Sequence, residues 1–202
     1  EYADGTHEVV KSDLDWRTSG GPLVFNSIYT SEHYDARLEQ PGWSAPGFDD
    51  SAWGGVMYRG APSQRVTAQQ TVPIRNVTQY RPRSVRKLDE RSYLYDFGQN
   101  MAGVTKLRLR GEAGTQLRLI HAERLREDGH AALSNIDVYF RPTDKDDLFQ
   151  TDVVTLSGRD DEFMPRFNYK GFRYVEVVAD RPVELSAENL TAYAMHSDVT
   201  PV

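Results

Sequence analysis

The chain has 202 residues, of which 39% are hydrophobic and 27% charged, and its formal net charge is −6. This composition supports a packed core and argues against disorder, and the length fits one β-sandwich domain over residues 1–202. No basic run reaches five residues and no apolar run approaches the roughly 20 residues of a membrane span, so we expect neither a nucleic-acid nor a membrane partner.

The sequence contains no cysteine, which excludes disulfides and thiolate metal sites but leaves the cellular compartment open. It begins at Glu1, without a methionine or a leader-like segment. We therefore expect it to be a fragment of a longer multidomain protein, with any export signal lying outside it.

The predicted elements are short strands separated by turn residues. In chain order they are Leu23–Tyr29, Val66–Val77, Val85–Leu88, Tyr93–Phe97, two runs within Lys106–Glu123, Asn135–Phe140, Phe149–Leu156, Phe172–Val178 and Leu190–His196. No stretch of a dozen residues keeps a helical period, and turn signals recur about every 8–12 residues. This pattern predicts an all-β chain, folded as a jelly-roll-like antiparallel β-sandwich.

The clearest alternation lies in the segment from Tyr93 to Glu123. Apolar Leu117 and Leu119 flank Arg118, which is the period of a strand with one buried face. The sequence GEAGT at 111–115 separates this run from an earlier alternating run, and its two glycines predict a hairpin. Ahead of it, the sequence FGQN at 97–100 is expected to bend the chain.

The segment Gln40–Trp53 holds two prolines, two glycines, two tryptophans and a phenylalanine. It is too interrupted for a regular element and too aromatic for a flexible linker. We expect an ordered loop packed by its own rings, in which Trp43 or Trp53 fills the loop core or stacks on a sugar ring.

Six strings, in this order, resemble the accessory β-sandwich region of bacterial α-L-rhamnosidases, the family 78 glycoside hydrolases, a region that overlaps carbohydrate-binding module family 67. The strings are YDAR (34–37), PGW (41–43), PGFDDSAW (46–53), YDFGQNMAG (95–103), HAERL (121–125) and PRFNYKGFRYVEV (165–177). The resemblance extends from about Trp16 to Asp198, nearly the whole chain. The resemblance implies a secreted or periplasmic bacterial protein.

The resemblance also implies that catalysis takes place elsewhere. In this family a separate helical barrel carries out inverting hydrolysis with two carboxyls roughly 6.5–9.5 Å apart. We therefore expect this chain to be non-catalytic: it would bind a rhamnose-containing oligosaccharide or polysaccharide, or brace the catalytic barrel of the same polypeptide. The alternatives are a purely structural spacer without a ligand and, less favoured, a hydrolase in its own right.

The resemblance implies a calcium ion at Asp35, since sugar-binding members bridge protein oxygens and two rhamnose hydroxyls through calcium. Ala36 departs from that pattern, and the favoured alternative is that Asp35 pairs with Arg37 or caps a turn. The expected carbohydrate-binding residues are Asp35, Arg37, Trp43, Trp53 and Asn100, with Asp35 also as the metal ligand. Asn100 has a structural alternative, in which its amide bonds neighbouring groups of the bend.

His121 and Glu123 alternate with Ala122 and are expected to share a face. Such a pair is chemically suited to acid–base work. Without a pocket or a metal, an interface salt bridge explains it better.

Overall fold

The computed structural model describes residues 1–61, 63, 65–137 and 148–199. The chain divides into two compact units. Unit 1 comprises Glu1–Gly21 and Gln40–Gln69, and unit 2 comprises Pro22–Glu39 and Gln70–Val202. Whether both belong to a single folding domain stays a prediction.

Unit 1 contains one short antiparallel pair, β1 (Arg17–Thr18) with β4 (Gly54–Gly55). Its aromatic loop is packed by its own side chains. The rings of Phe48 and Trp53 lie 5.6 Å apart, and Trp53 Nε1 donates to Gln40 Oε1 at 2.8 Å. A half-buried indole N–H needs such an acceptor. The prediction of an ordered, self-packed loop is confirmed.

Unit 2 is built on a ten-stranded sheet. Its longest path runs β2-β3-β11-β8-β13-β7-β14-β5, and β6 and β12 also pair with β7. The strands are β2 (Leu23–Ser27), β3 (Ser31–Asp35), β5 (Ile74–Tyr80), β6 (Ser84–Lys87), β7 (Ser92–Arg110), β8 (Gln116–Ala122), β11 (Thr151–Thr155), β12 (Asp160–Phe163), β13 (Lys170–Ala179) and β14 (Leu190–Ser197). Every pair is antiparallel except β3 with β11.

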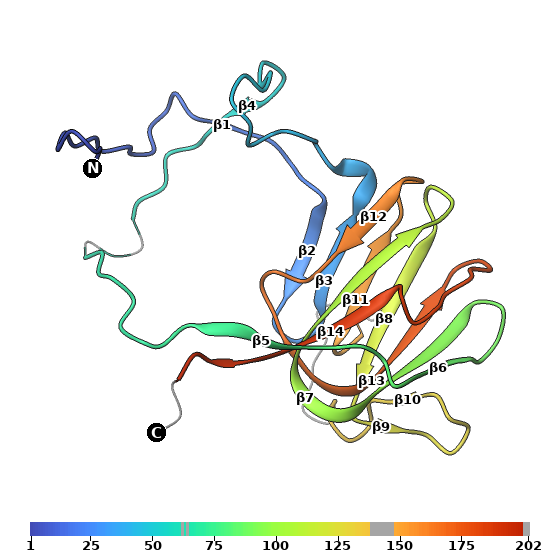
Figure 1. The fold of residues 1–202 in the computed structure, drawn as a ribbon. Helices are drawn as coiled ribbons and strands as arrows, with labels where there is room; N and C mark the ends of the chain where they lie inside the picture. The colour runs from blue at the N-terminus through green and yellow to red at the C-terminus, as the bar shows by residue number, and fades with distance from the viewer. Residues whose placement is uncertain (62, 64, 138–147, 200–202) are drawn as a thin grey trace. The chain divides into compact units, whose positions relative to one another are not determined.

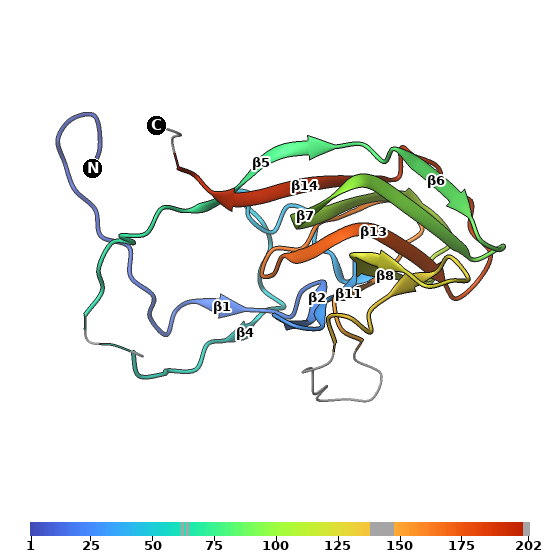
Figure 2. The same cartoon turned by 90° about the horizontal axis from the view of Figure 1, so that it is seen from below.

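The sheet curls, so that in Figures 1 and 2 β7 and β14 form one layer and β8 and β11 the other. A short 3₁₀ turn, η1 (Ala36–Leu38), follows β3, and a two-residue pair, β9 (Arg124–Leu125) with β10 (Ala131–Ala132), follows β8. The expected all-β sandwich is confirmed.

The core lies between the two layers. Leu117, Leu119 and His121 of β8 are all buried while Arg118 is exposed, which confirms the alternation seen in the sequence. Apolar side chains from β7, β11, β13 and β14 complete the core. They include Tyr95, Leu107, Val154, Phe172, Val175 and Leu190.

The predicted hairpin is wrong. β7 and β8 are joined by the turn at 111–115, but they do not pair with each other. β8 bonds instead to β11 and β13, while β7 bonds to β6, β12, β13 and β14. The sequence shows which residues are strand, but long-range packing decides which strands become neighbours.

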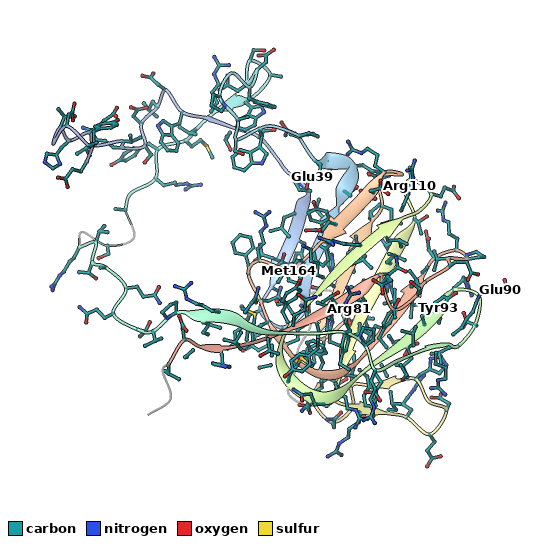
Figure 3. The ribbon with its side chains drawn as sticks, in the orientation of Figure 1. Glu39, Arg81, Glu90, Tyr93, Arg110 and Met164 are labelled. Atoms are coloured by element: carbon teal, nitrogen blue, oxygen red, sulfur yellow. The ribbon has the colours of Figure 1, made fainter. Side chains whose placement is uncertain are left out.

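The bend expected at 97–100 does not interrupt the strand, because β7, which is 19 residues long, runs through these positions. Tyr93 and Arg110, near its two ends, lie far apart in Figure 3. Gly98 takes a left-handed φ of 83°, its N–H donates to Asp96 Oδ1 at 2.7 Å, and the register with β13 shifts between Phe172 and Tyr174. The glycine therefore supports a local irregularity within a continuous strand.

Of the strand expected at Val66–Val77, only the part after Pro73 forms, as β5. Proline has no N–H to give to a ladder, which explains this start. The strand expected at Asn135–Phe140 lies partly outside the described residues. Over the ranges that the structure describes, no helix is long and apolar enough to cross a membrane.

Candidate functional site

Two non-glycine residues with a left-handed backbone meet where β3 and β11 begin. Ser31 has a φ of 91° and Gln150 a φ of 48°. Backbone hydrogen bonds join the two segments: Gln150 N donates to Tyr29 O at 2.9 Å, and Thr151 N donates to Thr30 O at 3.3 Å. Such strained residues concentrate at functional sites, which makes this junction a candidate site.

Glu32, the residue after Ser31, is only 2% exposed. Its Oε1 accepts the backbone N–H groups of Arg166 and Phe167 at 2.9 and 2.7 Å, and also Asn168 Nδ2 at 3.0 Å. Burial raises the pKa of Glu32, against the opposing effect of the two backbone donors. A carboxylate that accepts successive N–H groups fixes the loop before β13.

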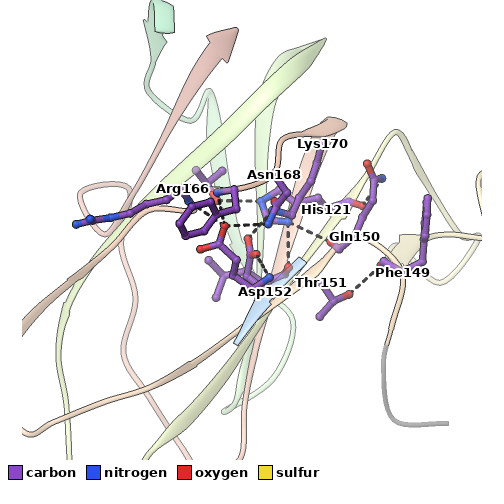
Figure 4. Close-up of polar contacts among 12 residues, drawn as sticks. His121, Phe149, Gln150, Thr151, Asp152, Arg166, Asn168 and Lys170 are labelled. Carbon is purple, nitrogen blue, oxygen red and sulfur yellow. Dashed lines mark hydrogen bonds and ion pairs between the residues drawn. The ribbon is translucent and has the colours of Figure 1, made fainter. Parts of the chain in front are cut away.

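Asp152 and Lys170 form a buried ion pair beside Glu32, shown in Figure 4. Lys170 Nζ lies 2.9 Å from Asp152 Oδ2. Asp152 Oδ1 accepts Glu32 N–H at 3.1 Å, and Lys170 donates to Asn168 Oδ1. Burial raises the pKa of Asp152, and the charge of Lys170 opposes this. The three ionisable groups thus tie β3, β11 and β13 together.

His121 lies in the same buried region (Figure 4). Burial first, and then the charge of Lys170, hold its pKa well below the usual value, so the ring is neutral. Nδ1 lies 3.0 Å from Leu119 O and Nε2 lies 2.9 Å from Thr105 Oγ1, which assigns the proton to Nδ1. Both nitrogens are occupied within the fold, and neither contacts Glu123. The structure therefore does not form the His121–Glu123 pair considered from the sequence.

Asp35 and Arg37 form a two-point ion pair, with distances of 2.9 and 2.6 Å, and Asp35 Oδ1 also accepts Arg37 N–H at 3.0 Å as the cap of η1. The hydrogen bond from Arg37 lowers the pKa of Asp35. This is the alternative that the sequence left open. Within the described ranges no three His, Cys, Asp or Glu residues gather as metal ligands, and the carboxylate of Asp35 is already occupied. These residues do not fit a calcium ion as they stand, and calcium here stays a prediction.

The structure does not gather the predicted sugar-binding residues into one site. Arg37 lies beside Gly114, ahead of β8, whereas Asn100 Nδ2 donates to Glu123 Oε1 at 3.0 Å, just beyond the other end of β8. The seven residues of β8 separate these places by about 24 Å, at about 3.4 Å per residue. Trp43 and Trp53 belong to unit 1.

The tryptophans of that loop have different surroundings. Trp53 is half-buried and hydrogen-bonded, as described above. Trp43 is 58% exposed. Its backbone forms a turn, in which Trp43 N donates to Gln40 O at 3.2 Å and Ala45 N donates to Gly42 O at 2.8 Å. Of the two, Trp43 is the ring that presents itself to solvent.

Comparison with known proteins gave two family matches, in separate parts of the chain. Residues 86–196 match the bacterial alpha-L-rhamnosidase concanavalin-like domain, and residues 1–78 match the alpha-L-rhamnosidase N-terminal domain. A curated alpha-L-rhamnosidase of Streptomyces avermitilis is 40% identical over 98% of the chain. The chain spans 18% of that relative's length.

Solved structures show the same likeness. An alpha-L-rhamnosidase of Dictyoglomus thermophilum matches 98% of the chain at 35% identity with a TM-score of 0.84, over 22% of its own length. The Streptomyces avermitilis alpha-L-rhamnosidase, solved in complex with L-rhamnose, matches 98% of the chain at 40% identity with a TM-score of 0.84, over 18% of its length.

Proposed function

Because the chain belongs to the bacterial alpha-L-rhamnosidase family, we propose that it is a non-catalytic accessory β-sandwich that binds L-rhamnose-containing glycan on behalf of a catalytic region elsewhere in the same polypeptide. Inverting hydrolysis needs two carboxyls placed about an open substrate position, roughly 6.5–9.5 Å apart. The buried carboxylates are instead held by groups of the fold. Glu32 and Asp152 were described above, and Glu176 accepts Ala131 N–H and contacts His130 Nδ1, both at 2.7 Å.

The observation that carries the binding role is the exposed indole of Trp43, which stands on a backbone turn closed by hydrogen bonds. A flat, exposed ring can cover the C–H face of a sugar. One shallow site gives modest affinity. Tethering such a site to a catalytic region raises the local concentration of substrate there.

The test is a titration of the chain with L-rhamnose, followed by NMR, with calcium and with a chelator. We expect the Trp43 indole signal to shift, and Trp43→Ala to abolish that binding. Trp16→Ala is the matched control, because Trp16 is 49% exposed in the same unit. Wild-type protein that shows no response to sugar in either condition would refute the binding role.

The same titration tests calcium. If the ion binds at Asp35, it must displace Arg37 from that carboxylate, and Asp35→Asn removes any gain in affinity that calcium gives. An aryl rhamnoside assay completes the set: we expect no release of the aryl group by the 202-residue chain.

A structural spacer that braces the catalytic region is the second candidate. The closed Asp35–Arg37 pair favours it, since that pair leaves no free carboxylate where the resemblance places a ligand. A chain that folds normally but shows no NMR response to L-rhamnose or calcium would support this candidate.

A further inference from the structure

A second open position lies on the outer face of unit 2, where β13 and β7 pair. Gly171 lies opposite Ala102, which is exposed. Among the described residues, a Cβ placed on Gly171 would meet Glu123 Oε1 at 3.4 Å and no other atom within 4 Å. Gly171 and Ala102 have almost no side chain of their own, so within the described part of the chain they leave this stretch of sheet open beside a carboxylate.

Glu123 is half-buried there and held by two amides. Asn100 Nδ2 donates to Oε1 at 3.0 Å and Asn135 Nδ2 donates to Oε2 at 3.3 Å. Within the described part of the chain no cation pairs with it. By contrast Glu162 pairs with Lys106 at 2.6 Å and Arg108 at 2.7 Å. Each carboxylate oxygen has two acceptor directions, so one on each oxygen stays available for a further donor.

Tyr169 adds an aromatic ring on the same face. Successive residues of an extended chain alternate sides, and Lys170 is buried, so Tyr169 and Gly171 both turn outward. Tyr169 is 51% exposed. The backbone beneath it is fixed, since Gln150 Oε1 accepts Gly171 N–H at 2.9 Å and Gln150 Nε2 donates to Gly171 O at 3.2 Å. The strained conformation of Gln150 thus supports a positioned surface.

We propose that Tyr169, Glu123 and Asn100 form a second sugar-binding site, which takes a neutral sugar through two vicinal hydroxyls. The hydroxyls donate to the two oxygens of Glu123, the exposed amide of Asn100 lies beside them, and the C–H face of the sugar lies on Tyr169 over Gly171. An anionic ligand is disfavoured by the unpaired carboxylate. A metal ion is disfavoured because no three ligating side chains gather among the described residues.

This site shares no residue with the binding role proposed for Trp43, and rests on the proposed function only for its class of ligand. The test therefore uses Trp43→Ala protein, titrated with methyl α-L-rhamnoside and followed by the NMR signals of the Gly171 and Ala102 amides. We expect both signals to shift. Adding Glu123→Gln or Tyr169→Ala should weaken the response at least about tenfold, because each removes a principal contact of a small ligand. Glu127→Gln, an exposed carboxylate outside the site, is the control and should change nothing.

Shifts at Gly171 and Ala102 that disappear with Glu123→Gln support the site. Absence of these shifts, or an equal response to cyclohexanol, which lacks a vicinal diol, overturns it. If the second site is overturned in this way, a response of the Trp43 signal to sugar in wild-type protein would still support the proposed function. Circular dichroism of each variant shows whether the sheet is intact, and Glu123→Ala gives a second reading if Gln retains part of the contact.

Discussion

Replacing Lys170 by Met removes the cation from the buried cluster and keeps a side chain of similar length. Asp152 is 0% exposed and Glu32 is 2% exposed, so neither carboxylate can turn to water for compensation. Removing one partner of a buried pair costs about 3–5 kcal/mol, and the Asn168 carbonyl that loses its donor costs about 1 kcal/mol more. We therefore expect Lys170→Met to lower the free energy of unfolding by about 4–6 kcal/mol near neutral pH.

The pH dependence of this loss follows from the raised pKa of Asp152. A carboxyl whose pKa is higher in the folded state gives its full stability below the unfolded pKa of about 3.9, and loses it as the pH rises through the folded pKa. Without Lys170 the folded pKa rises further. The deficit of the variant should therefore shrink on acidification from about pH 7 to about pH 5, by up to about 1.4 kcal/mol per pH unit.

The assay is denaturant unfolding followed by circular dichroism at both pH values. Tryptophan fluorescence is unsuitable, because all three tryptophans, Trp16, Trp43 and Trp53, lie in unit 1. The control is Lys170→Met combined with Asp152→Asn, which leaves no unpaired aspartate and should come within about 2 kcal/mol of wild type. A single variant within about 1 kcal/mol of wild type, or with the same deficit at both pH values, would refute the reasoning.

Glu32→Ala should destabilise unit 2 by about 2–4 kcal/mol. It should also speed hydrogen exchange of the Phe167 amide, which loses its acceptor. An unchanged exchange rate at Phe167 would count against the role of Glu32 in fixing the loop before β13. Arg37→Ala should return the lowered pKa of Asp35 toward about 3.9, seen by NMR titration, unless Arg37 is not the cause of the shift. The Asp35–Arg37 pair contributes under about 1 kcal/mol of stability. Because the pKa of Asp35 is lowered in the folded state, this stability is present above the unfolded pKa and is lost as the pH falls through the folded pKa. In thermal unfolding, Gln150→Gly should be about 1 kcal/mol more stable than Gln150→Ala. Both variants lose the side-chain hydrogen bonds, but only glycine adopts a φ of 48° freely. The reverse order of stability would contradict backbone strain at this position.

The candidate site was harder to find from the sequence than the fold. Glu32 lies in a charged, exposed-looking segment, and its partner Asp152 is 120 residues away. The available signal was an aspartate within the predicted apolar strand Phe149–Leu156, which requires a buried partner. The sequence predicted a role for Asn100 but paired Glu123 with His121. Alternation along one strand cannot show that the hydrogen-bond donor to Glu123 is Asn100, on another strand.

The sequence by itself determined the class of fold, the self-packed aromatic loop and the family resemblance, because these depend on local periodicity and on short strings of residues. Only the tertiary structure decided that β13 inserts between β7 and β8, that three ionisable groups share one buried cluster, and that Gly171 opens beside Glu123. The physical reason is that strand order and burial depend on contacts between distant segments. The same alternating residues are compatible with several neighbours until the whole core is packed.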